Sequence, residues 1–198
     1  MRPRGRVPVA FEVPAGLELP LHIWGVRKLA SPLEPEVGLG AVAEGGGLFI
    51  DRSVSRQLGL EDDDVADILR RCRDELASRT TRLREGAGPH DLRGKSLIVV
   101  DDGIANGGTV RAAVDGLRQA GTRSVVVAVP VAPRSVLRDL YREGIDVVCR
   151  VACDQCGSVG RWYREFPQVP DDQVISLVRT RGRSGGGPAC DPLPALRP

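Results

Sequence analysis

Three strand-like segments joined by helical segments constrain the fold of this chain most. The strand-like segments are residues 96–100 (SLIVV), 124–129 (SVVVAV) and 145–151 (IDVVCRV), with helices expected at about 109–120 and 135–143 between them. Strands that are buried on both faces and joined by helices are typical of a parallel, doubly wound sheet. We therefore expect an α/β fold with a mainly parallel sheet. Its ligand site should lie at the carboxyl ends of the strands.

The N-terminal half adds shorter elements. Residues 19–26 (LPLHIWGV) have strand character, and residues 37–50 predict two short strands around a run of glycines, arranged as a hairpin. A helix is expected from about residue 60 to 84, because an acidic first turn precedes one apolar stripe. That stripe comprises Val65, Ile68, Leu69, Cys72 and Leu76. Cys72 is therefore expected to be a buried structural thiol.

Length and composition fit one domain. The 198 residues are 41% hydrophobic, enough for a single core. We expect one domain over residues 1–179 and a disordered tail over residues 180–198, which are rich in Gly, Pro and Arg and have no apolar period.

Charge and hydropathy exclude several function classes. Lys and Arg number 28 against 26 Asp and Glu, a net charge of +2, so a general nucleic-acid binder is not expected. No apolar run approaches the ~18 residues of a membrane span. The N-terminal sequence MRPRGR lacks the apolar run of a secretory signal. The sequence therefore favours a cytoplasmic protein without a membrane partner.

The segment 97–109 (LIVVDDGIANGGT) carries the chemistry. A buried strand delivers Asp101 and Asp102 to its carboxyl end, and a glycine-containing loop then enters a helix. Backbone N–H groups at such a helix start form a site for an anion, and the carboxylates can accept hydrogen bonds from a diol. The segment thus suits a sugar that bears a phosphate and free hydroxyls. The alternative is a turn in which the two aspartates merely cap the helix.

This segment resembles the loop that binds phosphoribosyl diphosphate (PRPP) in type I phosphoribosyltransferases. The resemblance implies that Asp101 and Asp102 hold the ribose 2′- and 3′-hydroxyls. It also implies that the loop and the Thr109 hydroxyl hold the 5′-phosphate. The loop residues are Gly103, Ile104, Ala105, Asn106, Gly107, Gly108 and Thr109.

The same resemblance implies the reaction and its partners. Members transfer phosphoribose from PRPP to a nitrogen acceptor, such as a nucleobase, and release diphosphate. Mg²⁺ is the implied cofactor, held mainly through PRPP rather than directly by protein ligands, and homodimers are common in this fold.

Further segments extend the resemblance over residues 3–178. Residues 3–9 (PRGRVPV) are similar to the family loop that contacts the diphosphate, which implies this role for Arg4, Gly5 and Arg6, with Lys28 of the segment VRKL as a further contact. Residues 35–46 and 159–169 resemble a bacterial branch of the family.

Departures from the family pattern bear on activity. Asn106 replaces a threonine whose hydroxyl would donate to the 5′-phosphate, and Arg6 replaces a loop glycine. Ala105 stands where enzymes for 6-oxopurines have an aspartate, which argues against hypoxanthine or guanine as acceptor. In the family a helix and a first strand precede the arginine loop, whereas only Met1 and Arg2 precede it here.

The expected fold is therefore N-terminally truncated, or the start is misassigned. Two alternatives to an active transferase follow: a non-catalytic PRPP- or nucleotide-binding regulatory module, and an inactive truncated relative.

The cysteines leave several interpretations open. Five cysteines without a secretion signal argue against a disulfide framework. Cys149, Cys153 and Cys156 have the spacing of an iron–sulfur ligand set, but unpaired thiols are the favoured interpretation. Cys153 and Cys156 could also join under oxidation.

Other side chains have structural and functional interpretations. His22 and His90 are expected to be structural or solvated. Three arginines, Arg79, Arg82 and Arg84, could belong to a mobile loop that closes over the diphosphate. We favour the alternative, in which they form a solvated face of the helix. Trp162 and Tyr163 could stack on a nucleobase, although simple packing is the favoured interpretation.

Overall fold

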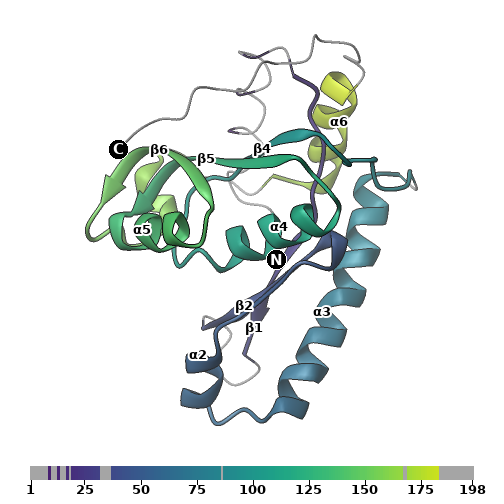
Figure 1. The fold of residues 1–198 in the computed structure, drawn as a ribbon. Helices are drawn as coiled ribbons and strands as arrows, with labels where there is room; N and C mark the ends of the chain where they lie inside the picture. The colour runs from purple at the N-terminus through teal and green to yellow at the C-terminus, as the bar shows by residue number, and fades with distance from the viewer. Residues whose placement is uncertain are drawn as a thin grey trace.

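The chain is described here from a computed structural model, which covers residues 9, 13, 17, 19–31, 37–85, 87–166 and 169–182 (Figure 1). The strands are β1 (Val26–Ala30), β2 (Gly38–Ala43), β3 (Leu48–Ile50), β4 (Ser96–Val100), β5 (Ser124–Pro133) and β6 (Asp146–Cys153). The helices are α2 (Arg52–Gln57), α3 (Asp62–Leu83), α4 (Gly108–Gln119), α5 (Arg134–Arg142) and α6 (Asp171–Gly182), with 3-10 turns η1 (Glu44–Gly46) and η2 (Val159–Trp162). Among the residues described, no helix combines the length and the apolarity needed to traverse a bilayer.

The C-terminal half contains the predicted parallel sheet, in the order β4-β5-β6. Strand β5 is central, and α4 and α5 pack against the sheet through a core that includes Val114, Val127, Val129 and Leu140. The α/β class expected from the sequence is confirmed. The described strands divide equally, however, between this sheet and an antiparallel one.

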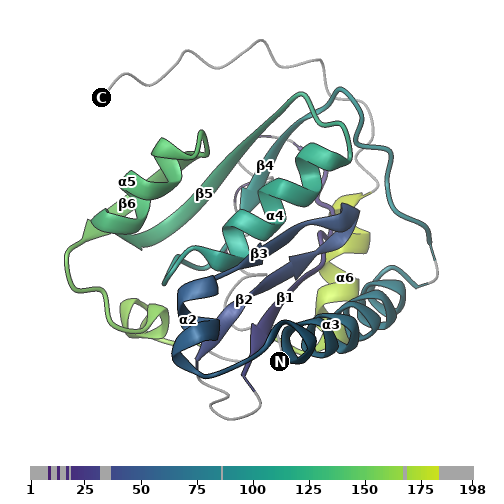
Figure 2. The same ribbon diagram turned by 60° about the horizontal axis from the view of Figure 1, so that its bottom comes forward.

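The antiparallel sheet has the order β1-β2-β3. Its Leu29 and Val42 pack against Cys72 and Leu76 of α3, which confirms Cys72 as a buried thiol. Helix α4 contacts strands of both sheets and lies between them (Figure 2). The close approach of α4 to η1 requires a glycine, because a Cβ on Gly116 would lie 2.0 Å from the Glu44 carbonyl oxygen.

Several predicted boundaries need correction. Residues 19–25 have no regular structure, and the strand begins only at Val26. The backbone N–H of Gly25 donates instead to the Glu44 carboxylate (2.5 Å). Helices α2 and α6 were not predicted from the sequence, and α6 runs to Gly182, into the segment expected to be a tail. Residues 183–198 of that segment lie outside the described residues.

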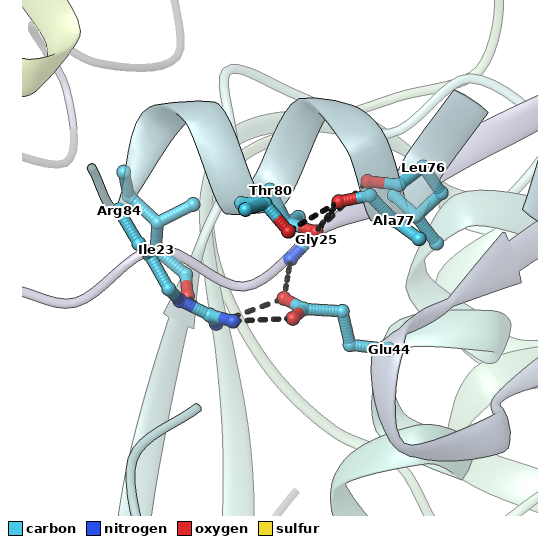
Figure 3. A network of polar contacts seen from close by, with 8 residues as sticks. Ile23, Gly25, Glu44, Leu76, Ala77, Thr80 and Arg84 are labelled. Carbon is cyan, nitrogen blue, oxygen red and sulfur yellow. Dashed lines mark hydrogen bonds and ion pairs between the residues drawn. The ribbon is translucent and has the colours of Figure 1, made fainter. Parts of the chain in front are cut away.

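An enclosed ion pair ties the antiparallel sheet to the end of α3 (Figure 3). The Arg84 guanidinium donates to both Glu44 carboxylate oxygens (2.5 and 2.9 Å) and to the Ile23 carbonyl oxygen (2.8 Å). Only 9% of the Arg84 side chain and 15% of the Glu44 side chain are exposed. The pair thereby joins the segment before β1, the turn after β2 and the last turn of α3.

Candidate functional site

Two adjacent carboxylates lie at the carboxyl end of β4, as the sequence predicts. Asp101 and Asp102 are 7% and 6% exposed. The Asp101 N–H donates to the Ala128 carbonyl oxygen (3.2 Å), and the Asp102 N–H donates to Asp101 Oδ1 (2.9 Å). The strand ladder therefore continues to Asp101, and the Asp102 N–H holds the Asp101 carboxylate in place.

The loop after these aspartates is anchored by β5. The Ile104 N–H donates to the Val131 carbonyl oxygen (2.9 Å), and the Ile104 side chain is buried in the core of the parallel sheet. Gly103 fits against its neighbours only without a side chain, because a Cβ there would lie 2.8 Å from Val159 Cγ1. Ile104 thus holds the loop through its side chain and backbone.

The loop ends at the N-terminus of α4. Gly107 is the N-cap in the left-handed conformation (φ 78°, ψ 0°). The first intrahelical bond runs from the Arg111 N–H to the Gly107 carbonyl oxygen, so the N–H groups of Thr109 and Val110 precede it. Such N–H groups, at the positive end of the helix dipole, are suited to binding an anion.

The side chain of Asn106 takes part in this turn. Its Oδ1 accepts a hydrogen bond from the Gly108 N–H (3.2 Å), which is an Asx-type turn. The side-chain Nδ2 is then the donor that Asn106 can offer to a ligand. The replacement of threonine by asparagine therefore changes which groups of the turn are available, and retains one donor.

Arg111 fastens the same loop from α4, and sequence reasoning missed this residue. Its guanidinium donates to both Glu143 carboxylate oxygens and to the Asn106 carbonyl oxygen (3.0 Å). It also lies over the Phe49 ring, 5.0 Å from the ring centroid. Because Glu143 is 32 residues away in the sequence, no local pattern could have indicated the pair.

Tyr163 contacts the main chain of Asp102. Its hydroxyl donates to the Asp102 carbonyl oxygen (2.6 Å), and its ring packs against Phe166 at 4.9 Å between centroids. Burial, and then the charges of Asp102 and Asp101, raise the pKa of Tyr163 to about 12. Tyr163 therefore both packs, as we favoured, and positions the backbone of a site residue.

The C-terminal cysteines require a correction. Cys153 and Cys156 are joined by a disulfide with 5.4 Å between their Cα atoms, although unpaired thiols were favoured from the sequence. Cys149 is a free thiol, and burial raises its pKa. Among the described residues, no three His, Cys, Asp or Glu side chains form a group that could hold a metal ion.

The remaining predicted contacts fall elsewhere. Arg4, Gly5 and Arg6 lie outside the described residues. Lys28 lies on β1, in the antiparallel sheet, and its side chain covers Gly38. The structure thus places Lys28 in a different sheet from the carboxylate pair.

The arginines of α3 are neither a mobile arm nor a simple solvated face. Arg79 and Arg82 both donate to the Asp171 carboxylate (2.9 and 2.5 Å). Burial raises the pKa of Asp171, but the hydrogen bonds and charges of the two arginines outweigh it, so that the net shift is downward. A cavity of about 860 Å³ lies beside these pairs, lined also by Arg27 and Asp172. The arginines therefore tie α6 to α3.

The two histidines meet in the structure. The ring centroids of His22 and His90 lie 4.0 Å apart, and the ring planes are tilted by 52°. Burial, and then the neighbouring His90, lower the pKa of His22. The contact joins the segment before β1 to the loop before β4, consistent with the structural role expected for both residues.

Comparison with known proteins agrees with this geometry. The family model "Phosphoribosyl transferase domain" matches residues 39–155, more than half of the chain. Two curated proteins, from Mycobacterium tuberculosis strains CDC 1551 / Oshkosh and ATCC 25618 / H37Rv, are each 38% identical over 176 residues, 89% of this chain. Both carry the name "Putative phosphoribosyl transferase". The chain covers only 40% of their length.

A solved structure is also similar. The crystal structure of TT1426 from Thermus thermophilus has 34% sequence identity and a TM-score of 0.70, over 88% of this chain and 83% of that one. The matched family model includes the segment with the two aspartates and the helix start. This chain therefore belongs to the phosphoribosyl transferase domain family.

Proposed function

We propose that this chain binds PRPP and transfers its phosphoribosyl group to a nitrogen acceptor, with release of diphosphate. The observation that carries the proposal is the buried pair Asp101 and Asp102, followed within one short loop by the N-terminus of α4. A phosphorylated ribose presents a diol and a dianion, the two kinds of group that such residues can bind. Family membership supports the same substrate.

The residues have distinct roles in this proposal. Asp101 and Asp102 accept hydrogen bonds from the ribose 2′- and 3′-hydroxyls and fix the sugar ring. The N–H groups at the start of α4 and the Thr109 hydroxyl hold the 5′-phosphate. The anomeric carbon is thereby held between the incoming nitrogen and the outgoing diphosphate, which is catalysis by orientation.

The chemistry balances without an oxidant or a protein nucleophile. The bond from the anomeric carbon to the diphosphate oxygen breaks, a bond from that carbon to the acceptor nitrogen forms, and the nitrogen loses a proton. Positive charge develops on the ribose in the transition state, and the two carboxylates stabilise it electrostatically. Arg4 and Arg6 are the proposed partners of the diphosphate, and lie outside the described residues.

Mg²⁺ fits the donor set as a cofactor bound largely through the substrate. The phosphate and hydroxyl oxygens of the substrate would supply most of the ligands, and the carboxylates of Asp101 and Asp102 would lie beside the ion as hard oxygen donors. When bound, the ion would supply charge neutralisation to the leaving diphosphate.

The test is calorimetric titration of PRPP into the full chain with MgCl₂. Asp102→Asn should weaken binding at least about tenfold, because a charge-assisted hydrogen bond contributes about 1.5–3 kcal/mol. Asp139→Asn, at an exposed aspartate of α5, is the matched control and should bind as the wild type does. Equal affinity of wild type and Asp102→Asn for PRPP would show that the Asp102 carboxylate does not bind the ribose hydroxyls.

A diphosphate-release assay with candidate nucleobases then separates two functions. Binding together with release supports a transferase. Binding without release under any acceptor supports a regulatory module that senses PRPP.

A further inference from the structure

We propose that Cys153 and Cys156 form a reversible dithiol–disulfide site that controls the affinity of the carboxylate site for PRPP. The inference rests on the proposed function and adds a regulation to it. The oxidised pair is the high-affinity form, and reduction by a dithiol weakens binding.

The disulfide lies at the edge of the sheet where the substrate would bind. Cys153 is the last residue of β6 and pairs in register with Pro133 at the end of β5. Because β4, β5 and β6 are parallel, their carboxyl ends share one edge, and Asp101 follows β4 on that same edge. Cys153 Sγ lies 3.6 Å from the Ala132 carbonyl oxygen, which places the sulfur against the end of the central strand.

A short chain of contacts connects the disulfide to the main chain of Asp102 and Gly103. The Trp162 indole N–H donates to the Cys156 carbonyl oxygen (2.9 Å). The neighbouring Tyr163 donates to the Asp102 carbonyl oxygen (2.6 Å). Val159, at the start of the same turn η2, packs against Gly103, where a Cβ would approach it to 2.8 Å. Turn η2 therefore contacts Cys156 through Trp162, and it contacts Gly103 of the loop after the aspartates through Val159.

The disulfide constrains the position of this turn. It closes residues 153–156 into a small ring and so fixes the carbonyl group that Trp162 uses. Reduction frees the Cys153 and Cys156 side chains and removes that constraint. Turn η2 then loses its fixed attachment, and Tyr163 no longer holds the Asp102 backbone in one position.

The chemistry is ordinary thiol–disulfide exchange. The thiolate of a dithiol reductant attacks one sulfur of the pair, a mixed disulfide forms, and the other cysteine leaves as a thiolate. The second thiol of the reductant then displaces the first cysteine. Two electrons and two protons pass to the protein, and the reductant becomes a disulfide. Asp154 and Gln155 between the cysteines are exposed, so a reductant can reach the bond.

The experiment compares two redox forms of the full chain. One sample is equilibrated with oxidised glutathione and the other with dithiothreitol, and alkylation followed by mass spectrometry reports the state of each cysteine. Calorimetry with PRPP and MgCl₂ then gives the affinity of each form. We expect the reduced form to bind at least about fivefold more weakly, the lower range of coupling between two sites.

A second readout follows the turn without substrate. The chain has two tryptophans, so Trp24→Phe leaves Trp162 as the sole indole reporter. The fluorescence of Trp162 should change on reduction, because its indole N–H donates to the backbone carbonyl of Cys156, one of the two disulfide-bonded residues. The double variant Cys153→Ala/Cys156→Ala should bind as the reduced form does under both conditions, whereas Cys149→Ala, at the free thiol of the same strand, should retain the redox difference.

The outcomes separate this inference from the function on which it rests. Equal affinity in the two redox forms overturns the redox inference and leaves the proposed function intact. Alkylation of both Cys153 and Cys156 after treatment with oxidised glutathione also overturns it. Failure to bind PRPP in either form overturns the proposed function, and the inference with it.

Discussion

The Tyr163 hydroxyl donates a 2.6 Å hydrogen bond to the main-chain carbonyl of Asp102, although 61 residues separate the two in the sequence. The bond uses the main chain of Asp102 and so fixes the backbone that carries its carboxylate. Tyr163 is therefore a positioning residue for the proposed ribose site.

Removing this hydroxyl should weaken substrate binding. Tyr163→Phe keeps the ring against Phe166 and deletes one hydrogen bond of about 0.5–1.5 kcal/mol, so PRPP affinity should fall about 2- to 13-fold. Calorimetry with MgCl₂ measures the change. Tyr141→Phe, at a tyrosine that is 72% exposed, is the control and should leave the affinity unchanged. An unaltered affinity in Tyr163→Phe would show that the hydrogen bond does not position the site.

Stability at alkaline pH should depend on the same hydroxyl. The pKa of Tyr163 is raised to about 12 in the folded chain, against about 10 in an unfolded one. Between these values the folded chain keeps a proton that the unfolded chain has lost, so the free energy of unfolding falls as the pH rises from about 10 to 12. Denaturant titrations across this range should show a shallower fall for Tyr163→Phe than for wild type. If the two pH profiles coincide while Tyr141→Phe also matches wild type, the shift is absent.

The left-handed glycine of the proposed phosphate loop can be compared with one outside that loop. Gly107 (φ 78°) and Gly144 (φ 70°) both have a positive φ that disfavours other residues, so alanine at either position should lower the free energy of unfolding by about 1 kcal/mol or more. A Cβ at Gly144 meets nothing within 4 Å, whereas one at Gly107 lies 2.6 Å from Arg111 Nη1. Only Gly107→Ala should therefore weaken PRPP binding. Equal losses of affinity in the two variants would mean that the effect is one of global stability.

The enclosed pair of Glu44 and Arg84 should dominate the stability of the antiparallel half. Arg84→Ala leaves a mostly buried carboxylate without its cation, a change that costs about 3–5 kcal/mol. Arg142→Ala removes an exposed pair with Asp139 and should cost less than about 1 kcal/mol. Urea unfolding of the two variants gives the comparison. A loss below about 1 kcal/mol in Arg84→Ala would show that the pair contributes no more than a surface ion pair.

The parallel half of the fold was predictable because its signals are local. The strand β4 and the helix α4 lie within one or two residues of the expected ranges. Their limits were predictable because an apolar run, two aspartates and a glycine-containing turn follow one another along the chain. The location of Asp101 and Asp102 at the carboxyl edge follows from the same order of elements. Their roles in binding remain predictions.

The features that could not be predicted depend on contacts between residues that are distant in the sequence. Residues 19–25 read as a strand, but the Gly25 N–H finds a partner in Glu44 rather than in a neighbouring strand. The positions of Arg84 and Arg111 could not be inferred, because their carboxylate partners lie 40 and 32 residues away. Helix α2 had a local signal that was overlooked, the Asp51 side chain that caps the Ser53 and Val54 N–H groups.

The position of α4 between the two sheets has a mechanical consequence. The N-terminus of α4 carries the proposed phosphate contacts, and its sides pack against β2 and β5. A ligand that binds only the folded helix start stabilises the whole chain increasingly as its concentration rises. Binding of PRPP should therefore slow amide hydrogen exchange in strands of both sheets, including strands that the ligand does not contact.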